Sequence, residues 1–406
     1  MQKFEKHSPV VVTEVTTKHE LRQFMQYPNR LYADNPNYIP SFYGDDLSDW
    51  TPGKNPAFDY CEARCWLARR DGEIVGRIGA ILSHKANDKF GTHRMRFSQV
   101  DFVDDSEVSA ALFGTVERWA REKGCDQVHG PLGFTDMDRE GMLVEGFDRR
   151  SLFFTNYNAP YYLEHLTRLG YRKDVDWIEY RITVPEPGGA EAERLHKLSE
   201  FILKRKHLHV ATVHHKSEYG PFVRQVFELV NAAYAPLYGV VELSDEQIER
   251  YANKFIPLVD PDFVCFVVDE QDQLVAFGVT ALDPSVALKH SDGRLFPFGW
   301  AGVLNDLHHS DTLIMLLTAV RPDLQTEGIN AVMMDHVCQS CNRHGVHFAE
   351  TGPMLELNDH ILAQWKRLEK KQHKRRRCFI KDLDHDVNAA NAAAAQTETP
   401  ETESAE

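Results

Sequence analysis

Two halves of this chain repeat one order of secondary-structure signals, and this repetition limits the possible folds more than any single motif. Each half opens with a helical segment and a loop rich in aromatic residues and proline. Each continues with two strands joined by a turn, at residues 65–82 and 263–282. A helix, a glycine and a short strand follow, ending at Gly130-Pro131 and Gly352-Pro353. A last helix and strand close each half, so the sequence predicts a duplicated unit.

The predicted unit is an α/β fold with a mixed sheet and helices on both faces. The PEPGG run at residues 185–189 can continue neither a strand nor a helix. We therefore expect a first domain over residues 1–184, a linker over 185–194, a second domain over 195–383 and a disordered acidic tail over 384–406. The alternative is one long α/β domain with halves that are similar by chance, but three successive matching features favour duplication.

The second half contains a loop of the type that binds phosphate groups. An apolar run from Leu313 to Val320 predicts a buried strand, and a helical pattern follows it. Between them the chain reads Q-x-x-G-x-x-A, with Gln325, Gly328 and Ala331 at the fixed positions. Free backbone N–H groups and the positive end of the helix dipole bind anions at such a turn, and a glycine allows close approach. No Gly-Lys-Ser/Thr follows, so the segment is not a P-loop.

This loop resembles that of the GNAT N-acyltransferase superfamily, where a Q/R-x-x-G-x-G/A pattern holds the pyrophosphate of coenzyme A. Gln325, Gly328 and Ala331 match three positions, and a register one residue shorter would use Asn330. Asn358 follows the next strand, as in the family. The resemblance implies two tandem GNAT-like domains, with acetyl-CoA or another acyl-CoA as substrate. It implies cofactor contacts for Ala319, Val320, Gln325, Glu327, Gly328, Ile329, Asn330, Ala331 and Asn358.

The resemblance also implies direct attack of an acceptor amine on the thioester, with a base that takes a proton from the amine. Glu350, at the end of the strand 347–351, is the candidate base, and a surface carboxylate is the alternative. Tyr238 is the second candidate catalytic residue; like Tyr234, it could donate a proton, shape the pocket or only pack. Trp365 stands where the family has a tyrosine that protonates the thiolate. An indole cannot take that role, so we expect a buried aromatic residue there.

The first half lacks the phosphate-binding loop. At the equivalent turn the sequence has Asp104, Asp105 and Glu107 and no glycine, and these carboxylates would repel a pyrophosphate. We therefore expect a degenerate first copy that supplies structure or part of an acceptor pocket.

A long loop in the first half carries three alternating acids, Asp136, Asp138 and Glu140. They provide too few fixed ligands for a calcium loop, so we expect acceptor recognition or an interdomain surface. The motifs GP-x-x-F, EGF and N-x-P-YY in this region resemble those of a bacterial group of GNAT-like proteins. That likeness extends from Thr13 to Leu383.

Charge and hydropathy exclude several classes of partner. The net charge of -15 argues against nucleic-acid binding. One basic run, residues 366–377, favours a solvated helix face or strand edge, with an anionic ligand as the alternative. No stretch of about 18 apolar residues exists, so no membrane span is expected. The first residues lack a secretory pattern, which predicts a cytoplasmic protein.

The seven cysteines do not complete a metal site. Cys338 and Cys341 lie in a helical pattern, but no second pair completes a set of four zinc ligands. We expect buried free thiols, no disulfide and no metal. The acceptor is expected to be a small-molecule or peptide amine, and the sequence leaves the oligomeric state open.

Three functional hypotheses follow. The first is an acyl-CoA-dependent N-acyltransferase, with acetyl as the expected acyl group. The second is a non-catalytic acyl-CoA-binding or sensor protein, which the tryptophan at the tyrosine position keeps open. The third is an aminoacyl-tRNA-dependent transferase of the peptidoglycan-building type, against which the acidic charge counts.

Overall fold

The structure, a computed structural model, describes residues 8–383, so the tail predicted over residues 384–406 lies outside the described residues. The first half supplies β1 (Val11–Glu14), α1 (Lys18–Leu31), α2 (Tyr43–Asp49), β2 (Cys61–Arg70), β3 (Glu73–Ser83), α3 (His84–Phe90), β4 (Arg94–Phe102), α4 (Ser106–Glu122), β5 (Gln127–Gly130), β6 (Met142–Glu145), α5 (Tyr161–Arg168) and β7 (Arg172–Thr183).

The second half begins with α6 (Ala190–Lys206), which follows the PEPGG run. It continues with β8 (His209–Val210), α7 (Gly220–Tyr234), α8 (Asp245–Phe255), β9 (Val264–Val268), β10 (Leu274–Leu282), α9 (Ser285–His290), α10 (Gly299–His309), β11 (Thr312–Val320), α11 (Asn330–His344), β12 (Phe348–Glu350), β13 (Met354–Leu355), α12 (Asp359–Ala363) and β14 (Lys370–Asp382).

Both halves have the predicted topology. In the first, β2 and β3 form an antiparallel hairpin, β4 pairs with β3, and β4 runs parallel to β5 across α4. In the second, β9, β10, β11 and β12 repeat this arrangement across α11. The hairpin turn at Asp71 and Gly72 has positive φ angles of 51° and 84°, as a two-residue type I′ turn requires. The duplicated mixed-sheet fold expected from the sequence is confirmed.

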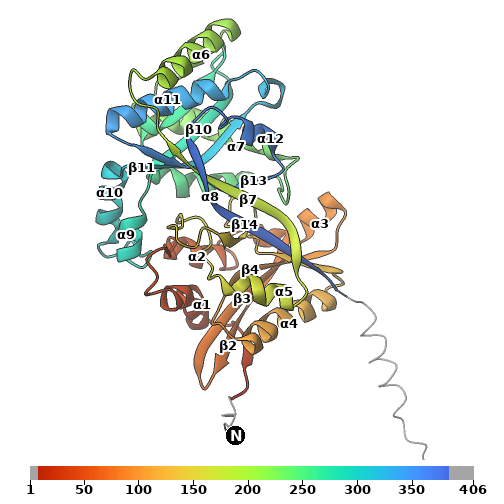
Figure 1. Ribbon diagram of the computed structural model, residues 1–406. Coiled ribbons are helices and arrows are strands. Elements are labelled where there is room, and N and C mark those ends of the chain that lie inside the picture. Colours follow the sequence, from red (N-terminus) through yellow and green to blue (C-terminus); the bar gives the residue numbers. More distant parts are fainter. Residues whose placement is uncertain (1–7, 384–406) are drawn as a thin grey trace, which may run out of the picture.

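The two halves exchange their last strands. The sheet has the order β1-β2-β3-β4-β5-β14-β7-β12-β11-β10-β9-β8, with β6 beside β14 and β13 beside β7. Strand β7, which ends the first half, pairs with β12 of the second, and β14, which ends the chain, pairs with β5 of the first. Strands β7 and β14 also pair with each other along most of their length. Figure 1 shows these two long strands running between the upper and lower parts of the molecule.

Ion pairs hold the exchanged strands together in the interior. Lys374 and Arg376 of β14 have no exposed side-chain surface, and both contact the equally buried Glu179 of β7. Burial opposes ionisation of Glu179, but the charges of Arg376 and Lys374 outweigh it and lower the pKa of this carboxyl to about 2. The solvated face expected for residues 366–377 is wrong in this part, because every second basic side chain enters the interior beside a partner from the other half.

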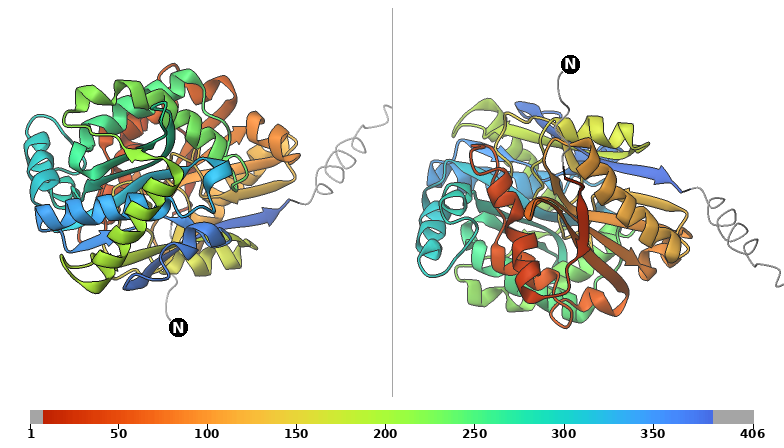
Figure 2. Two further views of the ribbon diagram at one scale, coloured as in Figure 1. Left: turned by 90° about the horizontal axis from the view of Figure 1, so that it is seen from above. Right: turned by 90° about the horizontal axis from the view of Figure 1, so that it is seen from below.

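Helices cover both faces of the second-half sheet, as the two views in Figure 2 show. Side chains of β9 alternate between these faces: Val264, Phe266 and Val268 pack against α7 and α8. Cys265 and Val267 pack with residues of α6 and α11. The strand is buried along its whole length, which explains its unbroken apolar sequence. Among the described residues no helix has the length and apolar character to cross a membrane.

Candidate active site

Strands β11 and β12 separate after a short parallel pairing. They pair at three positions, the last being Ile314 with Glu350. Beyond it, β11 stays paired with β10 up to Val320, whereas the chain after β12 leaves to pair with β7 as β13. Residues 315–320 therefore have one edge without a described strand partner, and a cavity opens beside that edge.

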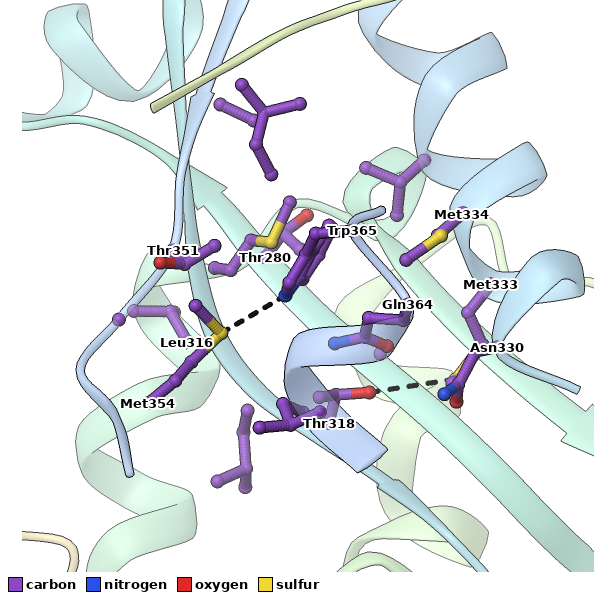
Figure 3. Close-up of a pocket in the computed structure, with 18 of the residues that line it drawn as sticks. Thr280, Leu316, Thr318, Asn330, Met333, Met334, Thr351, Met354, Gln364 and Trp365 are labelled. Carbon is purple, nitrogen blue, oxygen red and sulfur yellow. Dashed lines mark hydrogen bonds between the residues drawn. The ribbon is translucent and has the colours of Figure 1, made fainter. Parts of the chain in front are cut away.

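This cavity, here called the α11 cavity, has a volume of about 290 Å³. Its walls come from β11, from α11 and from the segment around α12. Figure 3 shows Met333, Met334, Gln364 and Trp365 around this space. The lining is mostly apolar and has the chemistry of a hydrocarbon-binding pocket.

Trp365 is buried, as expected, and stands in the wall of this cavity just after α12. Its indole Nε1 donates to Met354 Sδ at 3.1 Å. The thiols of Cys338 and Cys341 line the same cavity from α11, and both are buried and free, as the sequence predicted.

The Q-x-x-G-x-x-A loop leads directly from β11 into α11. Gly328 has a φ of 81°, and a Cβ atom there would lie 3.2 Å from Ile202 Cδ1 of α6. Helix α11 begins at Asn330, and Ile329 before it provides no side-chain cap for the first amides. The N–H groups of Ala331 and Val332 donate to Gly328 O and Ile329 O at 2.9 Å, so the donors that could face an anion are those of the turn before them. At the loop surface, Glu327 pairs with Lys206 of α6 at 2.6 Å.

The structure brings several predicted contact residues together around this loop and cavity. Asn330 and Asn358 both line the α11 cavity. The Asn358 side chain also caps α12, its Oδ1 accepting from Ile361 N at 3.2 Å. Ala319 and Val320 are buried and paired with β10, and the Gln325 side chain donates to Val320 O at 3.3 Å. The loop from Gln325 to Ala331 lies between this strand end and α11, and Ala331 is buried against the sheet.

Glu350, the predicted base, lies outside the lining of the α11 cavity. It is buried at the end of β12, with Oε1 3.4 Å from Arg181 Nη1 and Oε2 3.2 Å from Lys374 Nζ. Both carboxylate oxygens are therefore engaged by cationic side chains, which gives Glu350 the contacts of a structural ion pair.

Tyr238 lines the α11 cavity, but its hydroxyl is part of a closed polar network. The hydroxyl donates to Asp174, lies 3.0 Å from His129 Nδ1 and contacts Cys378 Sγ at 3.5 Å. Burial raises the pKa of Tyr238 well above its usual value. The ligand atoms of His129, Asp174 and Cys378 lie within 4.8 Å of one another, as in a metal site. The tyrosine hydroxyl reaches all three, so these polar atoms have partners without an ion.

A second cavity lies on the other face of the same strands. This α7 cavity has a volume of about 250 Å³ and is lined by apolar side chains of α7 and α8, with Phe154 from the first half. It adjoins the α11 cavity, because the two share part of their lining: Asp136, Glu140, Tyr234, Val279, Leu316, Leu317, Gly352 and Pro353. The shared residues lie where β11 and β12 diverge, so the two faces of the sheet communicate there.

Asp136 and Glu140 are the acidic residues at this junction, and both come from the first-half loop between β5 and β6. Asp136 Oδ1 is buried and has no hydrogen-bond partner among the described residues. Burial raises the pKa of Asp136 to about 6. Burial and the neighbouring Asp136 raise the pKa of Glu140 well above its usual value. Asp138, in contrast, accepts from the backbone N–H groups of Phe134 and Thr135 at 2.8 and 3.2 Å.

Sequence reasoning associated this loop with acceptor recognition but assigned no catalytic role to its acids. The available signal was the alternation of Asp136, Asp138 and Glu140 in a long glycine-containing loop. No feature of the local sequence distinguishes Asp136 and Glu140, which reach the junction, from Asp138, which accepts hydrogen bonds from the backbone of its own loop.

The equivalent helix start in the first half is already occupied. The Asp105 side chain caps α4 by accepting from the backbone N–H groups of Glu107 and Val108. Arg70 pairs with both Asp105 and Glu107. The amides that an anion would need are thus taken by the protein's own carboxylate.

Comparisons with known proteins agree with this architecture. No protein-family model matches the chain. Protein YghO of Escherichia coli (strain K12) is 27% identical over 379 residues, which cover 92% of this chain and 95% of YghO. Bacterial ceramide synthase of Caulobacter vibrioides (strain NA1000 / CB15N) is 28% identical over 300 residues, covering 72% of this chain and 75% of the synthase.

The solved structures show the fold. A tandem GNAT protein from the clavulanic acid biosynthesis pathway superposes with a TM-score of 0.52 at 12% sequence identity. The match covers 92% of this chain and 99% of that one, so it includes both halves in the same order. Together with the repeated topology and the diverging strands β11 and β12, this likeness establishes that the chain has the tandem GNAT fold.

Proposed function

We propose that this protein is an acyl-CoA-dependent N-acyltransferase that uses a long-chain acyl group. The observation that carries the proposal is the α11 cavity, which begins beside an uncapped helix N-terminus and continues as an apolar space in the gap between β11 and β12. The loop around Gly328 binds the diphosphate of coenzyme A, and the open edge of β11 pairs with the pantetheine arm. The thioester carbonyl then faces the junction of the two cavities, and the acyl chain lies along α11 beside Val337 and Cys341.

The size and chemistry of the cavity favour an acyl group longer than acetyl. The cavity of about 290 Å³ is lined by Met333, Met334, Val337 and Trp365, so it offers apolar walls to an acyl chain as well as to the pantetheine arm. The similarity to the Caulobacter ceramide synthase supports the same direction, because a ceramide is the amide of a fatty acid with a long-chain amine. We therefore propose a fatty acyl-CoA as donor and a lipid-like amine as acceptor, in the cytoplasm.

Calorimetric titration with acetyl-CoA and palmitoyl-CoA tests this function, followed by a thiol assay for released coenzyme A with sphinganine as acceptor. Gly328→Glu places a carboxylate where the diphosphate binds and should abolish binding of both donors. Gly328→Ala adds a side chain at the same positive φ without a charge, so it separates the effect of strain from the effect of charge. Gly345→Glu is the matched control, because Gly345 also has positive φ (69°) but lies at the opposite end of α11.

The two steps of the test separate the hypotheses. The transferase is supported if the wild type and Gly345→Glu bind palmitoyl-CoA, Gly328→Glu does not, and coenzyme A is released. Binding without any release would favour the sensor hypothesis. Absence of binding to either donor would contradict the proposal.

A further inference from the structure

The junction of the two cavities has an unusual balance of charge. Among the described residues no lysine, arginine or histidine lines either cavity, whereas Asp136 and Glu140 line both. Neither acid has an ion-pair partner in the described part of the chain. Burying an unpartnered carboxylate is costly, so such a group in an apolar junction points to a cationic ligand.

The α7 cavity has the properties of a hydrocarbon site that ends at these acids. Its walls include Val226 and Phe227 of α7, Ala252 of α8 and Phe266 of β9. It lies on the opposite face of the sheet from α11, so a molecule bound there approaches the junction from the other side. A ligand matching both features has an apolar tail and a single positively charged end.

We propose that the α7 cavity binds the tail of a long-chain primary amine and that Asp136 receives a proton from its nitrogen. This inference rests on the proposed function and adds the acceptor site and the base. It makes the first half, which has no coenzyme A loop, the source of the catalytic carboxylate. Glu140, next to Asp136, offers a further oxygen that can accept a hydrogen bond from an ammonium group.

The reaction balances with these groups alone. The acceptor arrives as an ammonium ion with three N–H protons. Asp136 takes the first proton, and the nitrogen lone pair forms the bond to the thioester carbon. As the C–S bond breaks, the second proton passes to the departing sulfur to give the free thiol, and the third stays on the amide nitrogen. Asp136 then releases its proton to solvent.

Two substitutions of the same kind test the placement of the tails. Val226→Phe fills the α7 cavity and Val337→Phe fills the α11 cavity, and each variant is the control for the other. We expect Val226→Phe to weaken decylamine binding at least tenfold and leave palmitoyl-CoA binding within about twofold. Val337→Phe should do the reverse. Decylamine is used below its micelle-forming concentration, and thermal unfolding checks that both variants fold.

A third variant tests the charge. The wild-type protein should bind decylamine at least tenfold more tightly than decanol, and Asp136→Asn should remove this preference without changing palmitoyl-CoA binding. Asp148→Asn, at an exposed position in the same half, is the matched control. This comparison remains decisive if a filled cavity prevents folding.

The outcomes distinguish the two proposals. The proposed acceptor site is overturned if Val226→Phe leaves decylamine binding unaffected. It is also overturned if Asp136→Asn binds decylamine as tightly as the wild type does. Palmitoyl-CoA binding without decylamine binding does the same while leaving the proposed function in place. Decylamine binding at Asp136 without any acyl-CoA binding would keep this site and contradict the transferase.

Discussion

Two carboxylates near the gap between β11 and β12 differ in their partners. Glu350 contacts Arg181 and Lys374, whereas Asp136 Oδ1 has no described hydrogen-bond partner. Ion pairing stabilises a carboxylate and lowers its proton affinity, while burial without a partner raises it. We therefore expect Glu350 to be a structural group and propose Asp136 as the proton acceptor.

Replacement of Glu350 should affect stability more than turnover. Glu350→Gln removes one of the two carboxylates that contact the fully buried Lys374, and Glu179 remains. We expect the free energy of unfolding to fall by about 1–3 kcal/mol in urea denaturation. The value of kcat/KM should fall far less than in Asp136→Asn, which is expected to lose about 10²–10⁴-fold. A large loss of kcat/KM with unchanged stability would restore Glu350 as the base.

The activity should depend on pH through Asp136. Burial raises the pKa of this carboxyl to about 6, and only its ionised form accepts a proton. Activity is therefore complete above the pKa and is lost as the pH falls through it. We expect kcat/KM at pH 5 to be about tenfold below its plateau. Measurement from pH 5 to 8 checks this, and an inflection that persists in Asp136→Asn would assign it to another group.

At the scale of elements, β7 and β14 depend on a buried cluster of charges. Glu179→Gln leaves Lys374 and Arg376 buried without full compensation, so it should cost about 3–5 kcal/mol of stability. Glu145→Gln, which breaks a half-exposed pair between β6 and Arg375 of β14, should cost less than about 1 kcal/mol. Urea denaturation of both variants measures the difference, and equal losses would contradict a special role of the buried cluster.

The pKa of Glu179 gives this cluster a pH dependence. The folded value of about 2 lies below the unfolded value of about 4.3. The stabilisation is complete above the unfolded value and is lost as the pH falls from there towards 2.

Elements with local signals could be predicted from the sequence. The turn at Asp71 and Gly72, the apolar strand before the loop and the glycine at position 328 each depend on neighbouring residues. The exchange of β7 and β14 could not be predicted, because strand pairing is non-local. The sequence of either strand is compatible with pairing in either half. The interior position of the basic run could not be predicted for the same reason. Arg376 is buried among partners far away in the chain, Glu179, Thr155 and Asn156.

The candidate site follows the same division. The side proposed to bind coenzyme A is formed by contiguous residues, from β11 through Gly328 to α11, and its pattern is visible in one stretch of sequence. The side proposed to bind the acceptor combines a first-half loop with α7 and α8 of the second half. Asp136 reaches the junction only in the folded molecule, so no spacing in the sequence could assign its role.

At the scale of the whole molecule, the exchange of strands makes each half incomplete alone. A fragment ending at residue 184 keeps β7 but lacks β14, so β5 becomes an open edge. A fragment beginning at residue 185 lacks β7, so β12 loses its second partner. The buried Glu179 is separated from Lys374 and Arg376 as well, which leaves uncompensated charges in both pieces.

We therefore expect neither fragment to unfold cooperatively when produced alone, and the two to form a 1:1 complex when produced together. A matched control is the intact protein cut by a protease at a site inserted at Gly188, which is exposed and where an added Cβ atom would meet nothing within 4 Å. The cut halves should stay associated in gel filtration, because β7 and β14 pair over most of their length. If fragment 1–184 unfolds as cooperatively as the whole protein, the first half is an independent domain. The pairing of β7 and β14 would then be a contact between two domains that fold separately.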